Sequence, residues 1–185
     1  AIRNKLIPLT KKNINSLISL LSNIQLDYKI NNSTGFSDIY LNGSNLESEI
    51  KSLEVSNHVS SIAEIPQIRK HVVKIQKSFQ HKGGLVMDGR DIGSVVFPNA
   101  DLKLFLTASD HIRAKRRFDE LINEGYKVNY DDIFNNIISR DKKDSERKDS
   151  PLIIPKDAVV IDNSEMSIID QLNFIIKLIK SKFNF

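Results

Sequence analysis

Three charged residues follow a short apolar run near the middle of the chain. The run Leu-Val-Met at residues 85–87 leads directly into Asp88-Gly89-Arg90-Asp91. A carboxylate at the end of a buried strand can hold a water bound to Mg²⁺, and a guanidinium beside it can bind phosphate. The same residues also suit a polar turn between two strands. This segment alone does not separate the two interpretations.

A second group of charged residues has helical spacing. Arg113, Arg116 and Arg117 fall at positions i, i+3 and i+4, so they share one face of a helix. Clustered guanidinium groups suit a phosphate group that gains negative charge in a transition state. The alternative is a solvated basic face, because Asp110 and Glu120 lie nearby in the sequence.

A third group follows further along the chain. Arg140, Asp144 and Arg147 fall at i, i+4 and i+7, within a strip of roughly 60° on one helix. The carboxylate can pair with both arginines while it accepts a hydrogen bond from a sugar hydroxyl. The alternative is an exposed ion pair worth about a few tenths of a kcal/mol. The four histidines show no spacing typical of metal ligands.

The rest of the sequence predicts the elements that hold these residues. Apolar periodicity and capping residues predict helices over residues 13–24, 55–65, 66–80, 110–125, 131–147 and 167–183. Apolar runs and turn residues predict strands over 26–30, 36–46, 85–88, 101–108 and 157–162, with a hairpin turn at Asn42-Gly43. The later strands do not alternate cleanly, which favours a parallel sheet covered on both faces. Strands alternating with helices indicate an α/β fold.

Composition limits the function classes. The chain has 185 residues, of which 40% are hydrophobic and 27% are charged, as in an ordinary soluble globular protein. It has no cysteine, no apolar run long enough to span a membrane and no secretory signal pattern, so we expect a cytoplasmic protein. The net charge of +4 allows an anionic ligand.

The order of the motifs is more informative than any one of them. DGRDIGSVVFP is followed by a strand, RAKRR on a helix, an EGYKVNYDD loop, RDKKDSER and a VVIDNS strand. This order resembles the bacterial cytidylate kinases, from the start of the chain to about Ile179. The resemblance implies ATP-dependent phosphorylation of CMP or dCMP in pyrimidine nucleotide metabolism, with Mg²⁺ as cofactor. It also implies a monomer whose partners are the small-molecule substrates, without nucleic acid or membrane.

The resemblance implies a P-loop nucleoside-monophosphate kinase fold of the α/β class. A parallel sheet would be flanked by helices within a single domain of residues 1–185. A nucleotide-binding insert would span about residues 24–61, and a helical lid about 110–148.

The resemblance also implies roles for individual residues at the positions that match the family motifs. The resemblance implies that Arg69 and Asp91 read the cytosine edge with Ser60 beside them, and that Arg90 binds the CMP phosphate. A carboxylate and a guanidinium together match the N4 donor and the N3 and O2 acceptors of cytosine. The monophosphate and the ribose would be held by Arg140, Asp144 and Arg147.

The remaining roles concern the transferring phosphoryl group. Arg113 and Arg117 would be lid arginines that close over this group. Asp88 would be the strand-end acid near magnesium, which it would hold through a water.

The sequence departs from the family pattern in one respect. The family opens with a strand and a phosphate-binding loop, G-x-x-x-x-G-K-[ST], and these 185 residues contain no such loop. We therefore expect that the first strand and the loop are absent from this chain, and that the chain as written is close to inactive. Two alternatives follow, a non-catalytic nucleotide-binding remnant and a basic nucleic-acid-binding module. RAKRR lacks the interleaved aromatic residues of the latter.

Overall fold

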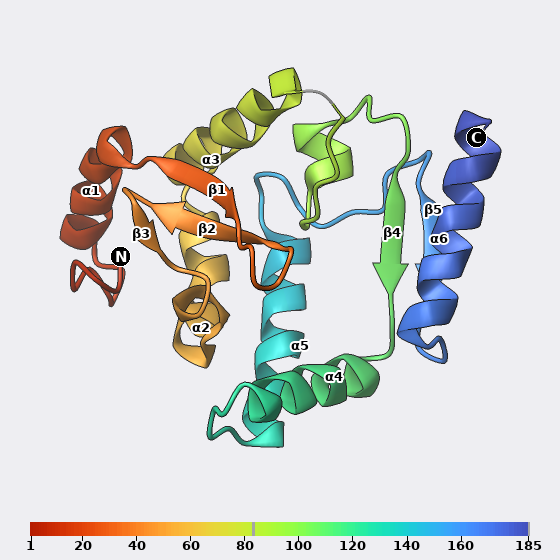
Figure 1. The fold of residues 1–185 in the computed structure, drawn as a ribbon. Helices are drawn as coiled ribbons and strands as arrows, with labels where there is room; N and C mark the ends of the chain where they lie inside the picture. The colour runs from red at the N-terminus through yellow and green to blue at the C-terminus, as the bar shows by residue number, and fades with distance from the viewer. Residues whose placement is uncertain (83, 185) are drawn as a thin grey trace. The chain divides into compact units, whose positions relative to one another are not determined.

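The computed structural model describes residues 1–82 and 84–184, which Figure 1 traces from red to blue. Two compact units divide the chain, Ala1–Val86 and Met87–Phe185. The insert at about 24–61 falls inside the first unit and the lid at about 110–148 inside the second. The expected single domain, with its insert and lid boundaries, stays a prediction.

The first unit combines three helices with a small sheet. Its elements are α1 Lys11–Leu20, β1 Leu26–Ile30, β2 Ser37–Leu41, β3 Ser44–Asn45, α2 Leu53–Ala63 and α3 Pro66–Ser78. The side chains of Thr10 and Ser52 accept hydrogen bonds from the first turns of α1 and α2, and Pro66 opens α3. The three predicted helices are confirmed. The first one ends at Leu20 because the next turn tightens into a 3₁₀ segment.

The sheet of the first unit is antiparallel, in the order β1-β2-β3. β1 pairs with β2 from Leu26↔Leu41 onward, and β2 turns directly into β3. The turn residues Asn42 and Gly43 have φ values of 49° and 83°. Both lie in the left-handed region that a two-residue hairpin turn requires and that Asn-Gly adopts readily. The predicted hairpin is therefore confirmed.

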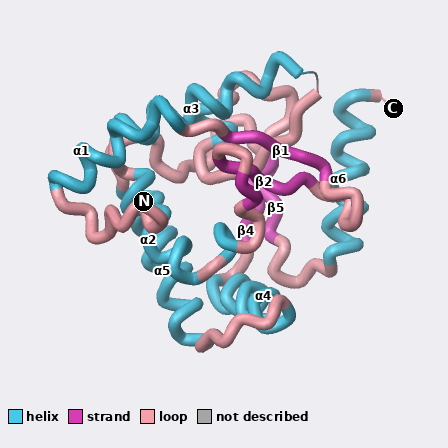
Figure 2. Tube along the Cα trace, turned by 60° about the vertical axis from the view of Figure 1, so that its left-hand side comes forward, coloured by secondary structure: helices cyan, strands magenta, loops and turns pink. Residues whose placement is uncertain are grey.

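The second unit contains the parallel strands. Its elements are β4 Leu104–Thr107, α4 Asp110–Asn123, α5 Tyr130–Glu146, β5 Val159–Asp162 and α6 Ile168–Phe183, with a π-helical segment at Ile92–Val96. β4 and β5 pair in parallel, from Leu104↔Val159 to Thr107↔Asp162. In Figure 2 these magenta strands are short beside the cyan helices. The expected α/β class with parallel pairing is confirmed.

The best-packed part of the second unit lies between α4 and α5. Ala114, Leu121 and Ile133 are at most 1% exposed. Partly buried apolar side chains surround them: Phe118, Tyr126, Val128, Tyr130, Phe134 and Ile137. This core fixes the two helices against each other. The arginines on both helices are therefore carried on one rigid support.

One predicted strand is wrong. Residues 85–88 have no regular secondary structure and belong to no sheet, and Val86 is fully exposed. A strand forms only where a neighbouring chain takes up its backbone N–H and C=O groups, and among the described residues no strand pairs with this segment. Apolar composition alone cannot supply that partner.

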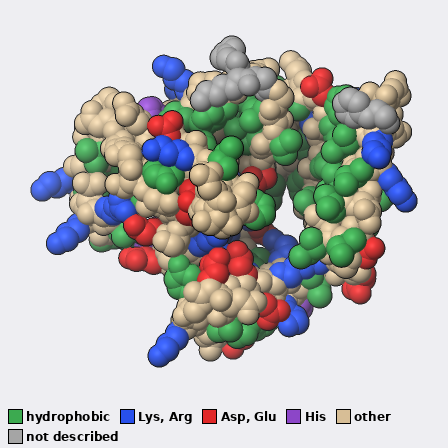
Figure 3. All heavy atoms as spheres, in the orientation of Figure 1, with side chains coloured by type: hydrophobic (Ala, Val, Ile, Leu, Met, Phe, Trp, Pro, Cys, Tyr) green, Lys and Arg blue, Asp and Glu red, His purple; other side chains and the backbone are tan. Residues whose placement is uncertain are grey.

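The prediction that both faces of the parallel strands are covered is also wrong. Leu106 and Val160 are about half-exposed, while Ile161 is buried. Several apolar residues of α6 are exposed as well, among them Ile168 at 88%, and Figure 3 shows hydrophobic side chains gathered over this helix. No helix among the described residues is both long and apolar enough to cross a bilayer.

Candidate functional site

The site begins at the loop that follows residues 85–88. Gly89 has a φ of +157°, and a Cβ at this position would lie 2.9 Å from Cγ1 of Ile92. Glycine is therefore required here on steric grounds. The backbone carbonyl of Asp91 accepts from the N–H groups of Val95 and Val96 at 2.9 and 3.2 Å. These contacts hold Asp91 in a buried position, 5% exposed.

The two other charged residues of this loop lie nearer to the solvent. The Asp88 side chain is exposed, and the Arg90 side chain is 40% exposed. Arg90 Nε lies 3.2 Å from Oδ2 of Asp144, and its Nη2 lies 3.3 Å from Oδ1 of Asp141. The guanidinium of Arg90 therefore joins the loop to two carboxylates on α5.

The C-terminal end of α5 holds a buried ion pair. Arg147 Nη1 lies 3.4 Å from Oδ1 of Asp144, and these side chains are only 3% and 5% exposed. Arg147 Nε also donates to the carbonyl of Ser150 at 2.5 Å, and the Asp144 carbonyl accepts from the N–H of Leu152 at 2.7 Å. Charges are buried at low cost only when they are paired and hydrogen-bonded in this way.

The predicted lid arginine Arg113 reaches α5 from α4. Its Nη1 donates to Oδ2 of Asp141 at 2.5 Å, and its Nη2 pairs with Asp110. Partial burial lowers the pKa of Arg113, but its hydrogen bonds to Asp110 and Asp141 outweigh that effect and raise the pKa above its ordinary value.

These contacts form a continuous series of alternating charges. Arg113 pairs with Asp141, Asp141 with Arg90, Arg90 with Asp144, and Asp144 with Arg147. We call these five residues the α5 ion-pair chain. It links α4, α5 and the loop at residues 88–91 through side chains that range from 3% to 40% exposed.

Arg140 adds positive charge beside the α5 ion-pair chain. Its side chain is half-buried, and desolvation lowers its pKa, with a further lowering from the nearby positive charge of Arg90. Asp144 and Asp141 oppose this shift, but the net pKa of Arg140 is lowered. Four arginines (90, 113, 140 and 147) thus lie near three aspartates, Asp110 of α4 and Asp141 and Asp144 of α5. Such an excess attracts an anion.

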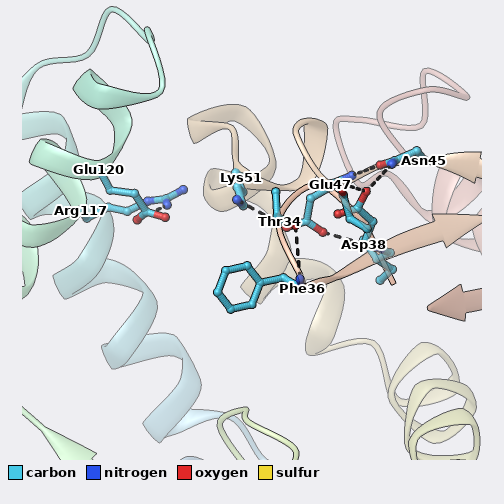
Figure 4. A network of polar contacts seen from close by, with 10 residues as sticks. Thr34, Phe36, Asp38, Asn45, Glu47, Lys51, Arg117 and Glu120 are labelled. Atoms are coloured by element: carbon cyan, nitrogen blue, oxygen red, sulfur yellow. Dashed lines mark hydrogen bonds and ion pairs between the residues drawn. The ribbon is translucent and has the colours of Figure 1, made fainter. Parts of the chain in front are cut away.

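The three arginines of α4 have different partners. Arg117 Nη1 donates to Glu120 at 2.6 Å, as Figure 4 shows. Arg116 donates to the side-chain oxygen of Asn163 at 2.9 Å and to the carbonyl of the same residue at 2.7 Å. Arg116 therefore anchors α4 to the end of β5, while Arg113 reaches α5. Of the face predicted from their spacing, Arg113 and Arg117 lie near α5, where the charge of Arg117 adds to the desolvation that lowers the pKa of Arg140, whereas Arg116 lies at the end of β5.

The predicted base-reading residues are divided between the two units. Ser60 is 4% exposed on α2, and Arg69 is half-buried on α3, both in the first unit. Asp91 belongs to the second unit. The roles of these three residues stay predictions.

The first unit has a polar network of its own, part of which is drawn in Figure 4. Asp38 Oδ2 accepts from the side-chain amides of Asn31 and Asn45 at 3.1 and 2.9 Å. Glu47 accepts from the N–H of Ile39 at 3.3 Å and pairs with Lys51 at 3.5 Å. This network ties the hairpin strands to the segments beside them. Sequence analysis did not predict it.

No group of three or more metal-ligating side chains occurs among the residues that the structure describes. Mg²⁺ commonly binds through one or two carboxylates, with nucleotide phosphates and waters as the other ligands. The role expected of the exposed Asp88 in holding Mg²⁺ stays a prediction.

Sequence analysis also missed Asp141. It pairs with both Arg90 and Arg113, although no role was assigned to it. Its position three residues before Asp144 places both carboxylates on one face of the helix. This spacing was the one signal in the sequence that could have identified it.

Comparisons with known proteins agree with the motif order. The cytidylate kinase family model matches residues 4–181. A cytidylate kinase of Flavobacterium johnsoniae is 46% identical over 97% of this chain and 78% of its own length. A cytidylate kinase of Flavobacterium psychrophilum is 42% identical over 98% of this chain and 80% of its own length. A cytidylate kinase of Cytophaga hutchinsonii is 41% identical over 92% of this chain and 73% of its own length.

The first two matches cover 78% and 80% of those relatives' own lengths and do not test whether a segment precedes Ala1. The matches do not favour the remnant or the nucleic-acid-binding module. From the family match over residues 4–181 and these identities, the chain belongs to the cytidylate kinase family.

Proposed function

We propose that this chain transfers the γ-phosphoryl group of ATP to CMP or dCMP, which gives ADP and CDP or dCDP. The α5 ion-pair chain carries the proposal, because its arginines and the neighbouring Arg140 outnumber the carboxylates around them by four to three, Asp110 included. A nucleoside monophosphate supplies a phosphate dianion, which guanidinium groups bind through two parallel hydrogen bonds. The relatives' name, cytidylate kinase, supports the choice of nucleotide.

The monophosphate would bind to Arg90, Arg140 and Arg147. Asp144 would accept a hydrogen bond from the ribose. Its two oxygens face Arg90 and Arg147 separately, and a carboxylate oxygen has two lone pairs, so one can accept from a sugar hydroxyl. The buried Asp144–Arg147 pair would hold this group at a fixed position.

The base would be read by Arg69 and Asp91, with Ser60 beside them. A carboxylate accepts from the N4 amino group of cytosine, and a guanidinium donates to N3 and O2. Uracil presents O4 in place of the N4 donor, so the carboxylate would face an acceptor. This difference would favour CMP over UMP.

Phosphoryl transfer depends mainly on positioning and on charge neutralisation. Arg113 and Arg117 on α4 would neutralise negative charge on the transferring group. Mg²⁺, when bound with ATP, supplies further neutralisation of the phosphate oxygens. Asp88 would hold the ion through a water, which fits its exposed carboxylate. The lid arginines are the residues of this chain that we assign to the transferring phosphoryl group.

A coupled assay of ADP release tests the proposal. CMP, dCMP, UMP and AMP are compared as phosphate acceptors with MgATP. We expect the highest kcat/KM with CMP or dCMP, because only cytosine offers an N4 donor together with the O2 acceptor. Equal or higher values with AMP would contradict the proposed substrate.

The base contact is tested separately with Asp91→Ala. Loss of the carboxylate leaves N4 without its acceptor, a penalty of about 1–3 kcal/mol when water is excluded. The ratio of kcat/KM for CMP to that for UMP should therefore fall. An unchanged ratio would show that Asp91 does not read the base.

A further inference from the structure

Asp141 has an arrangement that the proposed roles leave unexplained. Its Oδ1 faces Arg90 Nη2 at 3.3 Å, and its Oδ2 accepts from Arg113 Nη1 at 2.5 Å. One of these arginines comes from the loop at residues 88–91 and the other from α4. A single carboxylate thus bridges the arginine proposed for the acceptor phosphate and an arginine proposed for the transferring phosphate.

A phosphate group offers what this carboxylate offers. Both present oxygens with negative charge to guanidinium N–H donors, at similar hydrogen-bond distances. Without an anion between them, Arg90 and Arg113 would repel each other and Arg140, whose pKa the positive charge of Arg90 already lowers. Asp141 therefore contributes to the neutralisation of these arginines while no phosphate is bound, together with Asp144 beside Arg90 and Asp110 beside Arg113.

We propose that Asp141 is a positioning residue that occupies the phosphate-binding faces of Arg90 and Arg113, and that a bound phosphate group displaces it from both. The inference rests on the proposed function in one respect, namely that these two arginines bind phosphate. The inference goes beyond the proposed function because it assigns to Asp141 a role in competing with bound phosphate for these arginines.

The exposure of the side chains distinguishes Asp141 from Asp144. Asp141 is 24% exposed, and its partners Arg90 and Arg113 are 40% and 28% exposed. Ion pairs between partly exposed side chains cost less to break than a fully buried pair, because water can reach the separated partners. The side chain of Asp144 is 5% exposed and faces the buried Arg147, so its release would leave a charge in the interior. Asp141 is therefore the carboxylate that a bound phosphate group can displace from its arginines.

The test is the affinity of the full chain for inorganic pyrophosphate, measured by isothermal titration calorimetry at fixed ionic strength. Asp141→Asn keeps the shape of the side chain but removes its charge. We expect pyrophosphate to bind about three- to tenfold more tightly to this variant, as expected for loss of a weak competing ion pair. Asp141→Glu keeps the charge and should restore the wild-type affinity.

The matched control is Asp132→Asn. Asp132 is exposed on α5, nine residues before Asp141 in the sequence and roughly 13 Å away along the helix axis. This variant changes the net charge by the same amount, so its affinity shows the general effect of charge. The gain for Asp141→Asn must exceed the gain for Asp132→Asn.

Pyrophosphate affinity of Asp141→Asn that is equal to or weaker than that of the control variant would overturn the inference. If Asp141→Asn does not fold, as judged by thermal unfolding, Asp141→Ser provides the same test. In turnover assays, Asp141→Asn should lower kcat without raising KM for CMP, since the arginines are less well oriented but no longer blocked. Failure of the proposed function would appear as absence of CMP turnover in the wild type, a result separate from the calorimetric comparison.

Discussion

Two buried aspartates, one in each unit, illustrate two uses of the same side chain. Asp38 in the first unit is 9% exposed, and Asp144 in the second is 4% exposed. Asp38 accepts from the side-chain amides of Asn31 and Asn45, whereas Asp144 faces the guanidinium groups of Arg90 and Arg147. Both aspartates are buried, so the two networks differ mainly in the groups that face the carboxylate.

The donors determine what each network can do. Amides satisfy Asp38 without bringing any charge of their own, so this network fixes a hairpin and offers nothing to an anion. Guanidinium groups bring charge to Asp144 and extend beyond it toward Asp141 and Arg113. A carboxylate surrounded by arginines therefore organises an anion site, and one surrounded by amides organises a fold.

The strongest test of this comparison is Asp144→Asn. The variant leaves the buried guanidinium of Arg147 without its charged partner. Removing one member of a buried ion pair typically costs about 3–5 kcal/mol, and we expect the free energy of unfolding, measured in urea, to fall by about this amount. CMP affinity should fall with it. A loss well under about 1 kcal/mol, as for an exposed pair, would contradict the account.

Gly89→Ala should disturb the second network without changing a charge. The backbone conformation of Gly89 is one that side chains rarely adopt, and the new Cβ would meet Ile92. Strain of this kind costs about 1–3 kcal/mol. We expect that loss in urea denaturation, together with weaker CMP binding because Arg90 is displaced. Gly84→Ala is the control, since a Cβ at Gly84 meets nothing within 4 Å. Equal losses for the two variants would argue against the role of Gly89.

Asp38→Asn replaces the buried carboxylate of the first network by an amide, as Asp144→Asn does in the second network. The amide oxygen of the new residue can still accept from Asn31 or Asn45, so we expect stability to fall by about 1 kcal/mol or less. CMP affinity should not change. A calorimetric titration of CMP checks this, and weaker binding by this variant would mean that the two networks are not independent in function.

The smallest effect is expected for an ion pair outside both networks. Lys103 is 9% exposed, and its Nζ lies 2.8 Å from Oδ1 of the exposed Asp157. The hydrogen bond from Lys103 lowers the pKa of Asp157 below its ordinary value. A lowered carboxyl pKa stabilises the folded state above the ordinary value of about 4, and this contribution is lost as the pH falls through the lowered value.

Asp157→Asn should therefore be slightly less stable than the wild type at neutral pH and show a flatter loss of stability in acid. Thermal unfolding between about pH 7 and pH 2 covers this range. A difference between the two proteins that does not shrink below about pH 4 would show that the pair does not contribute through its charge.

Much of the fold could be predicted because its determinants are local. Thr10, Ser52 and Pro66 mark the starts of helices, and the Asn42-Gly43 turn specifies a hairpin. The strand expected at residues 85–88 was wrong, because strand formation depends on a partner elsewhere in the chain. The sequence has no local feature that reports such a partner.

The candidate site shows the same division. The pairing of Asp144 with Arg147 follows from their spacing on one helix. The contacts of Asp141 with Arg90 and Arg113 depend on how the loop and α4 pack against α5, which no spacing specifies. Arg116 shares a helix face with Arg113 but binds the end of β5. This contact also depends on how the elements pack and not on spacing along the helix.

The central claim is that the arginines around α5 bind the phosphate of a cytosine nucleotide. Calorimetric titration of the chain with CMP and with cytidine tests it most directly, because the two ligands differ only in that phosphate. Charge-assisted hydrogen bonds from two or three arginines should make CMP bind at least about 100-fold more tightly than cytidine. Equal affinities for CMP and cytidine would contradict the claim.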